Sequence, residues 1–230
     1  MRPAPRLVTD PLPEEDRQEG PLRLFLPETL SGSQRYQLLT SLVVPRPIAW
    51  ISTQDRHGRR NLAPFSYFMA VSASPLIVGV SIGHRRSPQR GSLAPKDTLA
   101  NILETGVFCV NIVTDLLLEQ MNASAEDVPP DIDEFELARV SSRPAIRIDC
   151  PAVAEAPATL ECRLFKEVDL GGAPNTLILG RVVGVTLSSL LSPEGDDLLV
   201  EPELLGPVGR LGGDRYTLLG EQRHLKRPGR

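Results

Sequence analysis

Polar and aromatic side chains surround a proline in the stretch NLAPFSY, which begins at Asn61. Proline has no backbone N–H, so within a sheet it stands at an edge, at the start of a strand or at a bulge, where neighbouring backbone groups lack a strand partner. A planar heterocycle with carbonyl and imide edges pairs with such groups. Asn61 and Ser66 would add side-chain hydrogen bonds, and Phe65 or Tyr67 would cover an apolar edge. The alternative is an ordinary bulged edge strand around Pro64.

Cations gather before a predicted helix in GHRRSPQRGSLAPKDTLANI, residues 83–102. A helix N-terminus with free N–H groups and nearby cations binds phosphate, and Thr98 adds a hydroxyl in the first turn. Asp97 is the expected N-cap and would compete for those N–H groups, so a phosphate would lie beside the helix axis. The alternative is a solvated loop before a normally capped helix. The cations are Arg85, Arg86, Arg90 and Lys96.

Two hydroxyls, those of Ser52 and Thr53, end a strand that is expected to pair with residues 59–68. They would reach a ribityl chain or a phosphate, although Ser and Thr at such positions more commonly cap a turn. A flat polar ring near residues 61–67 and a phosphate near residues 85–98 together outline flavin mononucleotide (FMN).

The composition narrows the class of protein. The chain has 230 residues, a net charge of −4 and a pI near 5.5. This length suits one large domain, and so acidic a chain has no broad basic field for nucleic acid. Three cysteines without a CxxC pair indicate reduced thiols in the cytoplasm, and we interpret Cys109 and Cys162 as core residues. The histidines are too scattered for a zinc site.

The ends of the chain differ from its middle. Residues 1–20 are rich in proline and acidic residues and lack the apolar segment of a signal peptide. We predict a flexible arm over residues 1–20, one domain over 21–222 and a loose tail over 223–230. No run reaches the roughly 18 apolar residues that span a bilayer. A soluble, cytoplasmic protein without membrane contact is expected.

Short strands dominate the remaining pattern. Helices are predicted only over residues 97–105 and 114–126, with a short helical turn within 131–139, and a turn at 55–58 closes the first hairpin. Hairpin spacing and few helices predict an antiparallel β-barrel with helices at its ends. No GxGxxG follows a strand, which disfavours a Rossmann domain. The predicted strands are 42–53, 59–71, 76–83, 107–113, 158–168, 175–188 and 215–220.

Three local patterns make finer predictions. The alternation in residues 158–168 points Leu160, Cys162 and Leu164 inward and Thr159, Glu161 and Arg163 outward. A bulge or bend is expected at Gly180 or Gly184, and residues 151–157 are interpreted as a connector. In the first helix, the predicted buried stripe is Leu99, Ile102 and Leu103, and Gly106 ends the helix.

The motifs PRPIAWIST, NLAPFSYF, SPLIVGVSIG and KDTLANI…TGVFCVNIV, in this order, resemble the flavin reductase-like domain. This is an FMN-binding split-barrel family that includes flavoredoxins and small NAD(P)H:flavin oxidoreductases. The resemblance runs from about residue 40 to about residue 220. It implies a mainly β fold, a six-stranded Greek-key barrel with a few flanking helices, and a homodimer with the flavin near the subunit interface.

Carried over by position, the resemblance implies a cofactor site rather than a set of catalytic side chains. The ring would lie along Asn61, Ala63, Pro64, Phe65, Ser66 and Tyr67, and the ribityl phosphate near Ser52, Thr53, Ser81, Arg85, Lys96 and Thr98. No metal ligand and no catalytic acid or base is assigned, because the cofactor carries the hydride chemistry.

The resemblance also leaves alternatives open. The first is an oxidoreductase that passes hydride from NAD(P)H to FMN, with FAD as a possible substitute. The second is a flavoredoxin-like carrier that exchanges electrons with a redox partner protein without using NAD(P)H. The third is a sibling split barrel of the pyridoxamine phosphate oxidase or haem-binding type. The sequence does not distinguish NADH from NADPH or name the final electron acceptor.

Overall fold

The structure, a computed structural model, describes residues 20–86, 93–191 and 198–226. The predicted arm, apart from residue 20, lies outside the described residues, as do residues 227–230 of the predicted tail and Arg90 in the cationic loop. The chain divides into two compact units, Met1–Leu39 and Thr40–Arg230.

The first unit contains a short 3-10 helix, η2 (Pro27–Thr29), and most of the helix α1 (Gly32–Leu42), which the sequence analysis did not predict. The start of α1 is a capping box. The backbone N–H of Gln34 donates to Ser31 Oγ at 3.2 Å, and the N–H of Ser31 donates to Gln34 Oε1 at 2.9 Å. Arg35 Nη1 adds a bond of 2.7 Å to the carbonyl oxygen of Leu30.

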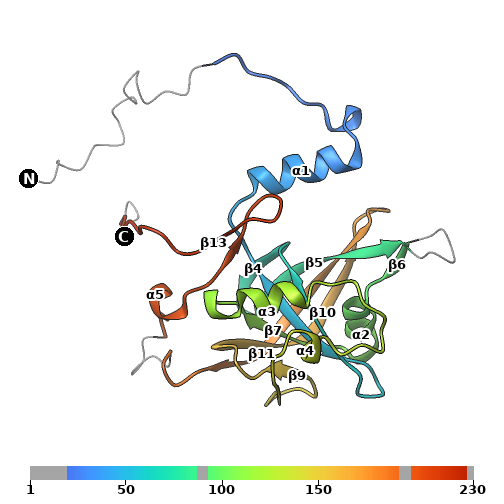
Figure 1. Cartoon of the computed structure of the whole chain (residues 1–230), viewed down its shortest axis with the longest axis vertical. Helices are drawn as coiled ribbons and strands as arrows, with labels where there is room; N and C mark the ends of the chain where they lie inside the picture. Colours follow the sequence, from blue (N-terminus) through green and yellow to red (C-terminus); the bar gives the residue numbers. More distant parts are fainter. Residues whose placement is uncertain (1–19, 87–92, 192–197, 227–230) are drawn as a thin grey trace, which may run out of the picture. The chain divides into compact units, whose positions relative to one another are not determined.

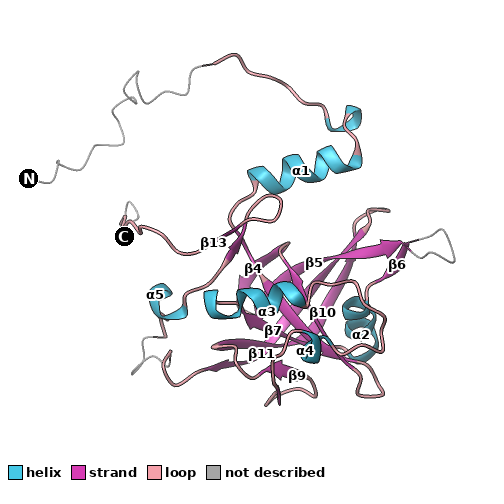
Figure 2. Ribbon diagram, viewed as in Figure 1, coloured by secondary structure: helices cyan, strands magenta, loops and turns pink. Residues whose placement is uncertain are grey.

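The second unit is built around one antiparallel sheet of eight strands, in the order β3-β2-β7-β10-β11-β5-β4, with β6 paired to β5 (Figure 2). The predicted mainly β fold is confirmed. The strands of this sheet are β2 (Ala49–Gln54), β3 (Arg60–Phe65), β4 (Phe68–Ala73), β5 (Leu76–Arg86), β6 (Leu93–Pro95), β7 (Val107–Ile112), β10 (Ala158–Asp169) and β11 (Asn175–Leu187).

The sheet has two strands more than the six-stranded barrel that the resemblance implies, because the run 59–71 divides into β3 and β4 and because the short strand β6 pairs with β5. Ser66 and Tyr67 form a corner between β3 and β4, which are the two outer strands of the sheet order. The chain therefore brings the two ends of the sheet together at one point. The N–H of Ser81 in β5 donates to the carbonyl oxygen of Tyr67 at 2.9 Å. The barrel closes there with no strand ladder between β3 and β5 among the described residues.

Smaller elements surround the barrel (Figure 1). Two short sheets are present: in one β12 pairs with both β1 and β13, and in the other β8 pairs with β9, so residues 151–153 are a strand rather than a connector. The added strands are β1 (Arg46–Pro47), β8 (Ser142–Pro144), β9 (Pro151–Val153), β12 (Gly209–Arg210) and β13 (Tyr216–Thr217). The helices are α2 (Asp97–Thr105), η3 (Asp115–Leu117), α3 (Leu118–Ala123), α4 (Glu134–Leu137) and α5 (Pro202–Leu205).

The core consists of three clusters. One fills the barrel, and two lie on the outer face of its strands. Leu99 and Ile102 of α2 enter the barrel cluster, whereas Leu103 is 41% exposed, so the predicted stripe is narrower by one residue. A second cluster packs α3 and α4 against the outer face of β2 and β3. In a third cluster, residues 145–152, including Cys150, pack against Cys109 of β7.

The third cluster lies on the face of β10 that was predicted to point outward, and this prediction is wrong for two residues. Glu161 and Thr159 are fully buried, because the segment before β9 covers this face. The Glu161 carboxylate accepts the N–H groups of Ile146, at 3.0 Å, and Arg147, at 2.6 Å. It therefore fastens the covering segment to the sheet. Arg163 is exposed, as predicted.

The predicted irregularities at Gly180 and Gly184 are confirmed, because the β10–β11 register shifts next to each of them. A Cβ at Gly180 would lie 3.0 Å from Cε1 of Phe108, a fully buried ring, and 3.3 Å from Cβ of Cys162. The glycine is therefore required by close packing of the barrel interior.

We expect Gly180→Ala to lower the free energy of unfolding by about 2 kcal/mol, because the added methyl overpacks a rigid core. Urea unfolding followed by circular dichroism measures this. Gly83→Ala in β5 is the matched control, since a Cβ there has only Asn175 Nδ2 nearby, at 3.7 Å. Equal stability of the two variants would contradict the prediction.

Candidate functional site

Pro64 lies on an outer strand of the sheet, β3, as the sequence predicted. The N–H of Leu62 donates to Glu134 Oε2 at 3.2 Å, so it points away from the neighbouring strand β2. Pro64 is two residues further along and has the same orientation. The missing N–H of Pro64 would therefore face the free edge, and β3 loses no ladder bond to β2.

Glu134, which the sequence analysis did not single out as a site residue, closes part of this edge. It begins α4, where Asp133 is the N-cap and accepts the N–H of Phe135 at 2.9 Å. Its side chain is 7% exposed, and Oε1 accepts from Asn61 Nδ2 at 2.7 Å. Burial raises the pKa of Glu134, against hydrogen bonds from Leu62 and Asn61 that lower it. Glu134 thus bonds to the edge strand through both carboxylate oxygens.

One buried group contains three of the predicted site residues, Thr53, Asn61 and Thr98, together with Asn101. We call these four residues the Asn61 cluster. Asn61 Oδ1 accepts from Thr98 Oγ1 at 2.6 Å and from Thr53 Oγ1 at 3.3 Å. Asn101 Nδ2 donates to Thr53 Oγ1 at 3.1 Å. All four side chains are buried. The cluster joins β2 and β3 to the first turns of α2.

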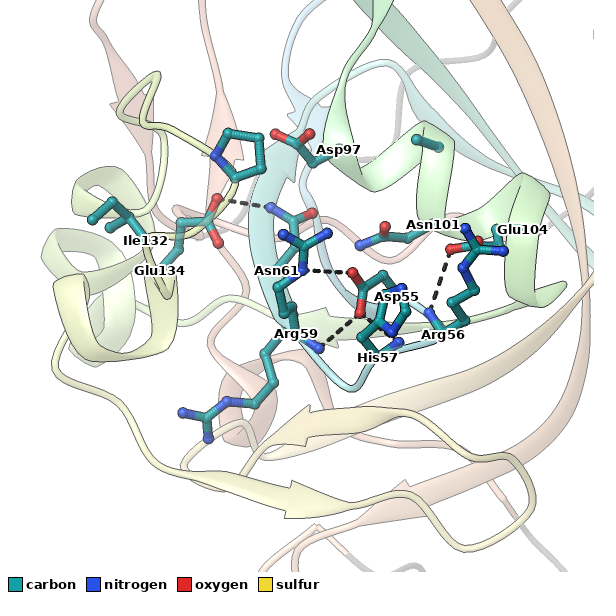
Figure 3. Close-up of a pocket in the computed structure, with 13 residues that line it drawn as sticks. Asp55, Arg56, His57, Arg59, Asn61, Asp97, Asn101, Glu104, Ile132 and Glu134 are labelled. Carbon is teal, nitrogen blue, oxygen red and sulfur yellow. Dashed lines mark hydrogen bonds and ion pairs between the residues drawn. The ribbon is translucent and has the colours of Figure 1, made fainter.

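A cavity of about 310 Å³ lies over the Asn61 cluster (Figure 3). Charged and polar side chains from the β2–β3 turn, from one face of α2 and from the segment before α4 surround it. The lining residues are Asp55, Arg56, His57, Arg59, Arg60, Asn61, Asp97, Ala100, Asn101, Glu104, Pro130, Ile132 and Glu134. This volume suits a small polar ligand or one end of a larger one.

The turn of the β2–β3 hairpin is ordered by Asp55. Its Oδ1 accepts the N–H groups of His57, at 2.9 Å, and Arg59, at 2.8 Å, and its Oδ2 accepts from Arg59 Nε at 2.7 Å. Burial alone would raise the pKa of Asp55, but these hydrogen bonds and the Arg59 charge lower it to about 2. The bond through Nε orients the Arg59 guanidinium toward the cavity (Figure 3).

The lowered pKa has a defined consequence for stability. Because folding lowers the pKa of Asp55, its contribution is present above the unfolded value, near 3.8, and is lost as the pH falls toward 2. We expect the thermal midpoint of the wild type to fall as the pH is lowered from about 3.8 to about 2. The midpoint of Asp55→Asn should fall less over the same pH range, because this variant has no carboxylate to protonate at position 55. Thermal unfolding between pH 5 and 2 measures it. Parallel curves for the two proteins would contradict the assignment.

The start of α2 differs from the prediction in one respect. Lys96 is the N-cap residue, Asp97 is the first helical residue, and no side chain caps the helix. Asp97 instead accepts from Arg85 Nη2 at 2.7 Å, because the charged guanidinium of β5 competes with the N–H groups for its carboxylate. Among the residues that the structure describes, no side chain accepts from the first-turn N–H groups of α2, which lie next to the exposed Lys96. Arg86 belongs to β5, and Arg90 lies outside the described residues.

Ser52 lies on the opposite face of β2 from Thr53, outside the cavity. Its Oγ donates to the carbonyl oxygen of Pro151 at 2.6 Å and accepts from Asn111 Nδ2 at 3.0 Å. It is fully buried. This position gives the Ser52 hydroxyl a role in joining β2 to β9.

The remaining predicted residues lie along β3 and its corner, except Ser81, which lies in β5. The side chains of Ala63 and Phe65 pack in the barrel cluster, and because their backbone groups alternate with those of Leu62 and Pro64, they face β2 rather than the free edge. Pro64, Ser66, Tyr67 and Ser81 are partly buried. Ser66 Oγ accepts from Nε of Arg46 at 3.3 Å, and Arg46 was not a predicted site residue.

None of the described helices is long and apolar enough to cross a membrane. Within the described ranges, no group of three or more His, Cys, Asp or Glu side chains is arranged to hold a metal ion. The cysteines Cys109, Cys150 and Cys162 are free and buried. An interaction with Cys109, together with burial, raises the thiol pKa of Cys150, and burial raises that of Cys162.

Comparisons with known proteins agree with this geometry. A family model described as the flavin reductase-like domain matches residues 41–200. An uncharacterized protein of Halalkalibacterium halodurans is 35% identical over 88% of this chain and 95% of its own length. The crystal structure of nitrilotriacetate monooxygenase component B from Bacillus cereus is similar with a TM-score of 0.83 and 32% identity, covering 90% of this chain and 100% of that one.

Two further structures extend the comparison. Pseudomonas fluorescens 2-nitrobenzoate 2-nitroreductase NbaA has a TM-score of 0.80 and 30% identity, over 90% of this chain and 97% of that chain. A Shewanella frigidimarina protein described as a flavin reductase with a split barrel domain has a TM-score of 0.74 and 23% identity, over 87% of this chain and 95% of that chain. At this identity it shows the fold alone, and it confirms the predicted split barrel.

Proposed function

The chain belongs to the flavin reductase-like domain family, and from this premise we propose that it binds FMN and transfers hydride to it from NAD(P)H. One observation carries the proposal. The outer edge of β3 lies next to the N-terminus of α2, which no side chain of the described residues caps, and the 2.6 Å bond between Thr98 and Asn61 joins the two elements. A planar polar ring with a phosphate tail has the chemistry that this pair of features binds.

The ring is assigned to the segment from Ala63 to Tyr67. Because Leu62 and Pro64 face outward, their carbonyl groups are available at the edge to the imide hydrogen of a flavin. Pro64 presents no N–H that would need a partner, and the Ser66 hydroxyl adds a polar contact. Glu134 already occupies the N–H of Leu62, so the ring is placed toward the Ser66 end of the strand.

The phosphate is assigned to the first-turn N–H groups of α2 and to Lys96, with Ser81 and Arg85 nearby. Arg85 is paired with Asp97 at 2.7 Å, which neutralises the carboxylate closest to the proposed phosphate. Thr53 and Thr98 support this site indirectly, because their hydroxyls bond to Asn61 rather than to open space. Ser52 is left out of the proposal, since both of its bonds are made behind the sheet.

A bound flavin would supply the hydride acceptor, and the protein supplies binding, orientation and charge. Hydride transfer from NAD(P)H requires no protein acid or base, so the proposal assigns no catalytic side chain. We place the protein in the cytoplasm, on the ground of its free thiols. The similar Bacillus cereus structure is component B of a monooxygenase, and on this ground the proposal includes a partner protein that uses the reduced flavin.

The proposal includes a homodimer with the flavin near the interface. The outer strand β4 exposes apolar side chains, with Met69 50% and Val71 45% exposed, and Leu76 at the start of the paired strand β5 is also 45% exposed. An exposed apolar edge strand is an association surface. Because β4 follows the corner at Ser66 and Tyr67 directly, an interface on this strand would lie near the proposed ring site.

We expect Met69→Lys to yield a monomer, because a buried interface does not accept an unpaired ammonium group. Size-exclusion chromatography with light scattering measures the mass. Leu116→Lys is the control, since Leu116 lies in η3 and is 88% exposed; this variant should remain a dimer. A wild type that is already monomeric, or an unchanged mass for Met69→Lys, would refute this interface.

The proposed activity is tested directly. Purified protein is titrated with FMN and with FAD by absorbance and fluorescence, and oxidation of NADH and of NADPH is then followed at 340 nm. Tight FMN binding with steady NAD(P)H oxidation supports the proposal. Bound FMN that neither nicotinamide reduces would replace it with the electron-carrier alternative, and a chain that binds no flavin would overturn both.

A further inference from the structure

A buried cation stands directly behind the corner between β3 and β4. Arg46 is 6% exposed, and its guanidinium makes four hydrogen bonds. Three go to carbonyl oxygens, of Thr40 at 2.7 Å, Val43 at 2.9 Å and Leu211 at 3.1 Å. The fourth joins Nε to Ser66 Oγ at 3.3 Å. The guanidinium thus lies one hydrogen bond from a residue of the proposed ring site.

The acceptors around Arg46 are all neutral. No carboxylate forms an ion pair with Arg46 in the part of the chain that the structure describes. A buried charge without a counter-charge is costly even when its hydrogen bonds are satisfied. The other described arginines around the site differ, since Arg59, Arg60 and Arg85 are each paired with an aspartate. Arg46 is therefore a preformed positive charge that polar carbonyl groups hold in place.

We propose that Arg46 stabilises the negative charge that the flavin ring gains on reduction; this inference rests on the proposed function. A hydride from the C4–H bond of a dihydronicotinamide would leave the nicotinamide as a cation and would add one negative charge to a bound flavin. A fixed cation close to that charge, in partly buried surroundings, stabilises the reduced state without reorganisation. Arg46 touches no reacting atom and acts through Ser66, so it is a positioning residue.

A purely structural role is the competing explanation, because Arg46 also joins α1, β1 and the loop at Leu211. The two roles predict different measurements. A structural anchor changes the stability of the protein and the affinity for both flavin states together. A charge that favours the reduced state changes the ratio of the two affinities, which is the midpoint potential of bound flavin.

Removing Arg46 is an ambiguous test, since its three carbonyl partners would lose their donor and the variant is at risk of misfolding. The better test keeps a long side chain with a hydrogen-bond donor at position 46 and changes only its charge. Arg46→Lys keeps the positive charge, and Arg46→Gln replaces it with a neutral amide donor. The two variants differ by one charge, so packing effects cancel in their comparison.

Both variants are titrated anaerobically with oxidised and with reduced FMN, and the midpoint potential of the bound flavin is measured against reference dyes. We expect Arg46→Gln to bind reduced relative to oxidised FMN at least tenfold less well than Arg46→Lys, which for a two-electron couple is about 30 mV. Equal ratios for the two variants, in a wild type that binds FMN, would overturn the role of Arg46 and leave the proposed function intact. A wild type that binds no flavin would overturn both.

Discussion

Replacing Glu134 by alanine should lower the free energy of unfolding by about 3 kcal/mol. The change leaves two buried donors, Asn61 Nδ2 and the N–H of Leu62, without the acceptors that now lie at 2.7 and 3.2 Å. Each buried donor without a partner costs about 1–3 kcal/mol. Urea denaturation followed by tryptophan fluorescence measures the loss, because Trp50 is fully buried in the cluster beneath α4.

A matched control lies in the same short helix. Glu136 is two residues further along α4 and its side chain is 81% exposed, with only a 3.9 Å contact to Arg60 Nη2. Glu136→Ala should change stability by less than about 0.5 kcal/mol. Equal losses for the two alanine variants would show that Glu134 does not hold the β3 edge.

The pKa of Glu134 adds a pH dependence to this comparison. Burial raises it in the folded state, so the full contribution of this group is present below the unfolded pKa and falls as the pH rises through the raised folded value. The stability difference between wild type and Glu134→Ala should therefore shrink as the pH rises across that interval. A difference that grows with pH would contradict the direction of the shift.

The barrel strands could be predicted from the sequence because their signals are local. Apolar runs bounded by Gly and Pro marked the long strands, and Pro64 and Gly180 marked an edge and an irregularity that the structure contains. The outward prediction for Glu161 failed because the segment that covers it is not visible in the alternation of its own strand. The helix α1 was missed although Ser31 and Gln34 form a capping box, since no clear apolar stripe follows them.

The sequence brought three candidate residues into one group, but it did not predict the contacts that they make. Thr53, Asn61 and Thr98 do come together, yet their polar atoms bond to one another rather than facing outward. Glu134 is 72 residues from Leu62 in the sequence, and no local pattern relates an acidic residue in a short helix to a strand edge so distant. Asp97 has a strong local signal for capping, which the Arg85 charge overrides.

The structure gives Lys96 and Thr98 different roles, which the sequence analysis did not distinguish. Lys96 is exposed at the N-cap of α2, whereas Thr98 is buried with its hydroxyl on Asn61. Lys96→Ala should therefore weaken FMN binding with little loss of stability. Thr98→Val should lower stability by about 1 kcal/mol, the usual net contribution of one hydrogen bond, and should affect FMN only through the position of Asn61.

Replacing both Lys96 and Thr98 by alanine is expected to weaken FMN binding by about 100-fold, which is about 2.7 kcal/mol. A charge-assisted contact to phosphate contributes roughly 1.5–3 kcal/mol, so Lys96 should carry most of the effect. Isothermal titration of FMN against riboflavin, which lacks the phosphate, isolates this contribution: riboflavin affinity should change less than threefold in Lys96→Ala. If FMN and riboflavin weaken equally, the phosphate does not lie at the start of α2. The oriented Arg59 guanidinium in the adjoining cavity would then be the next cation to test, because its Asp55 contact uses only Nε.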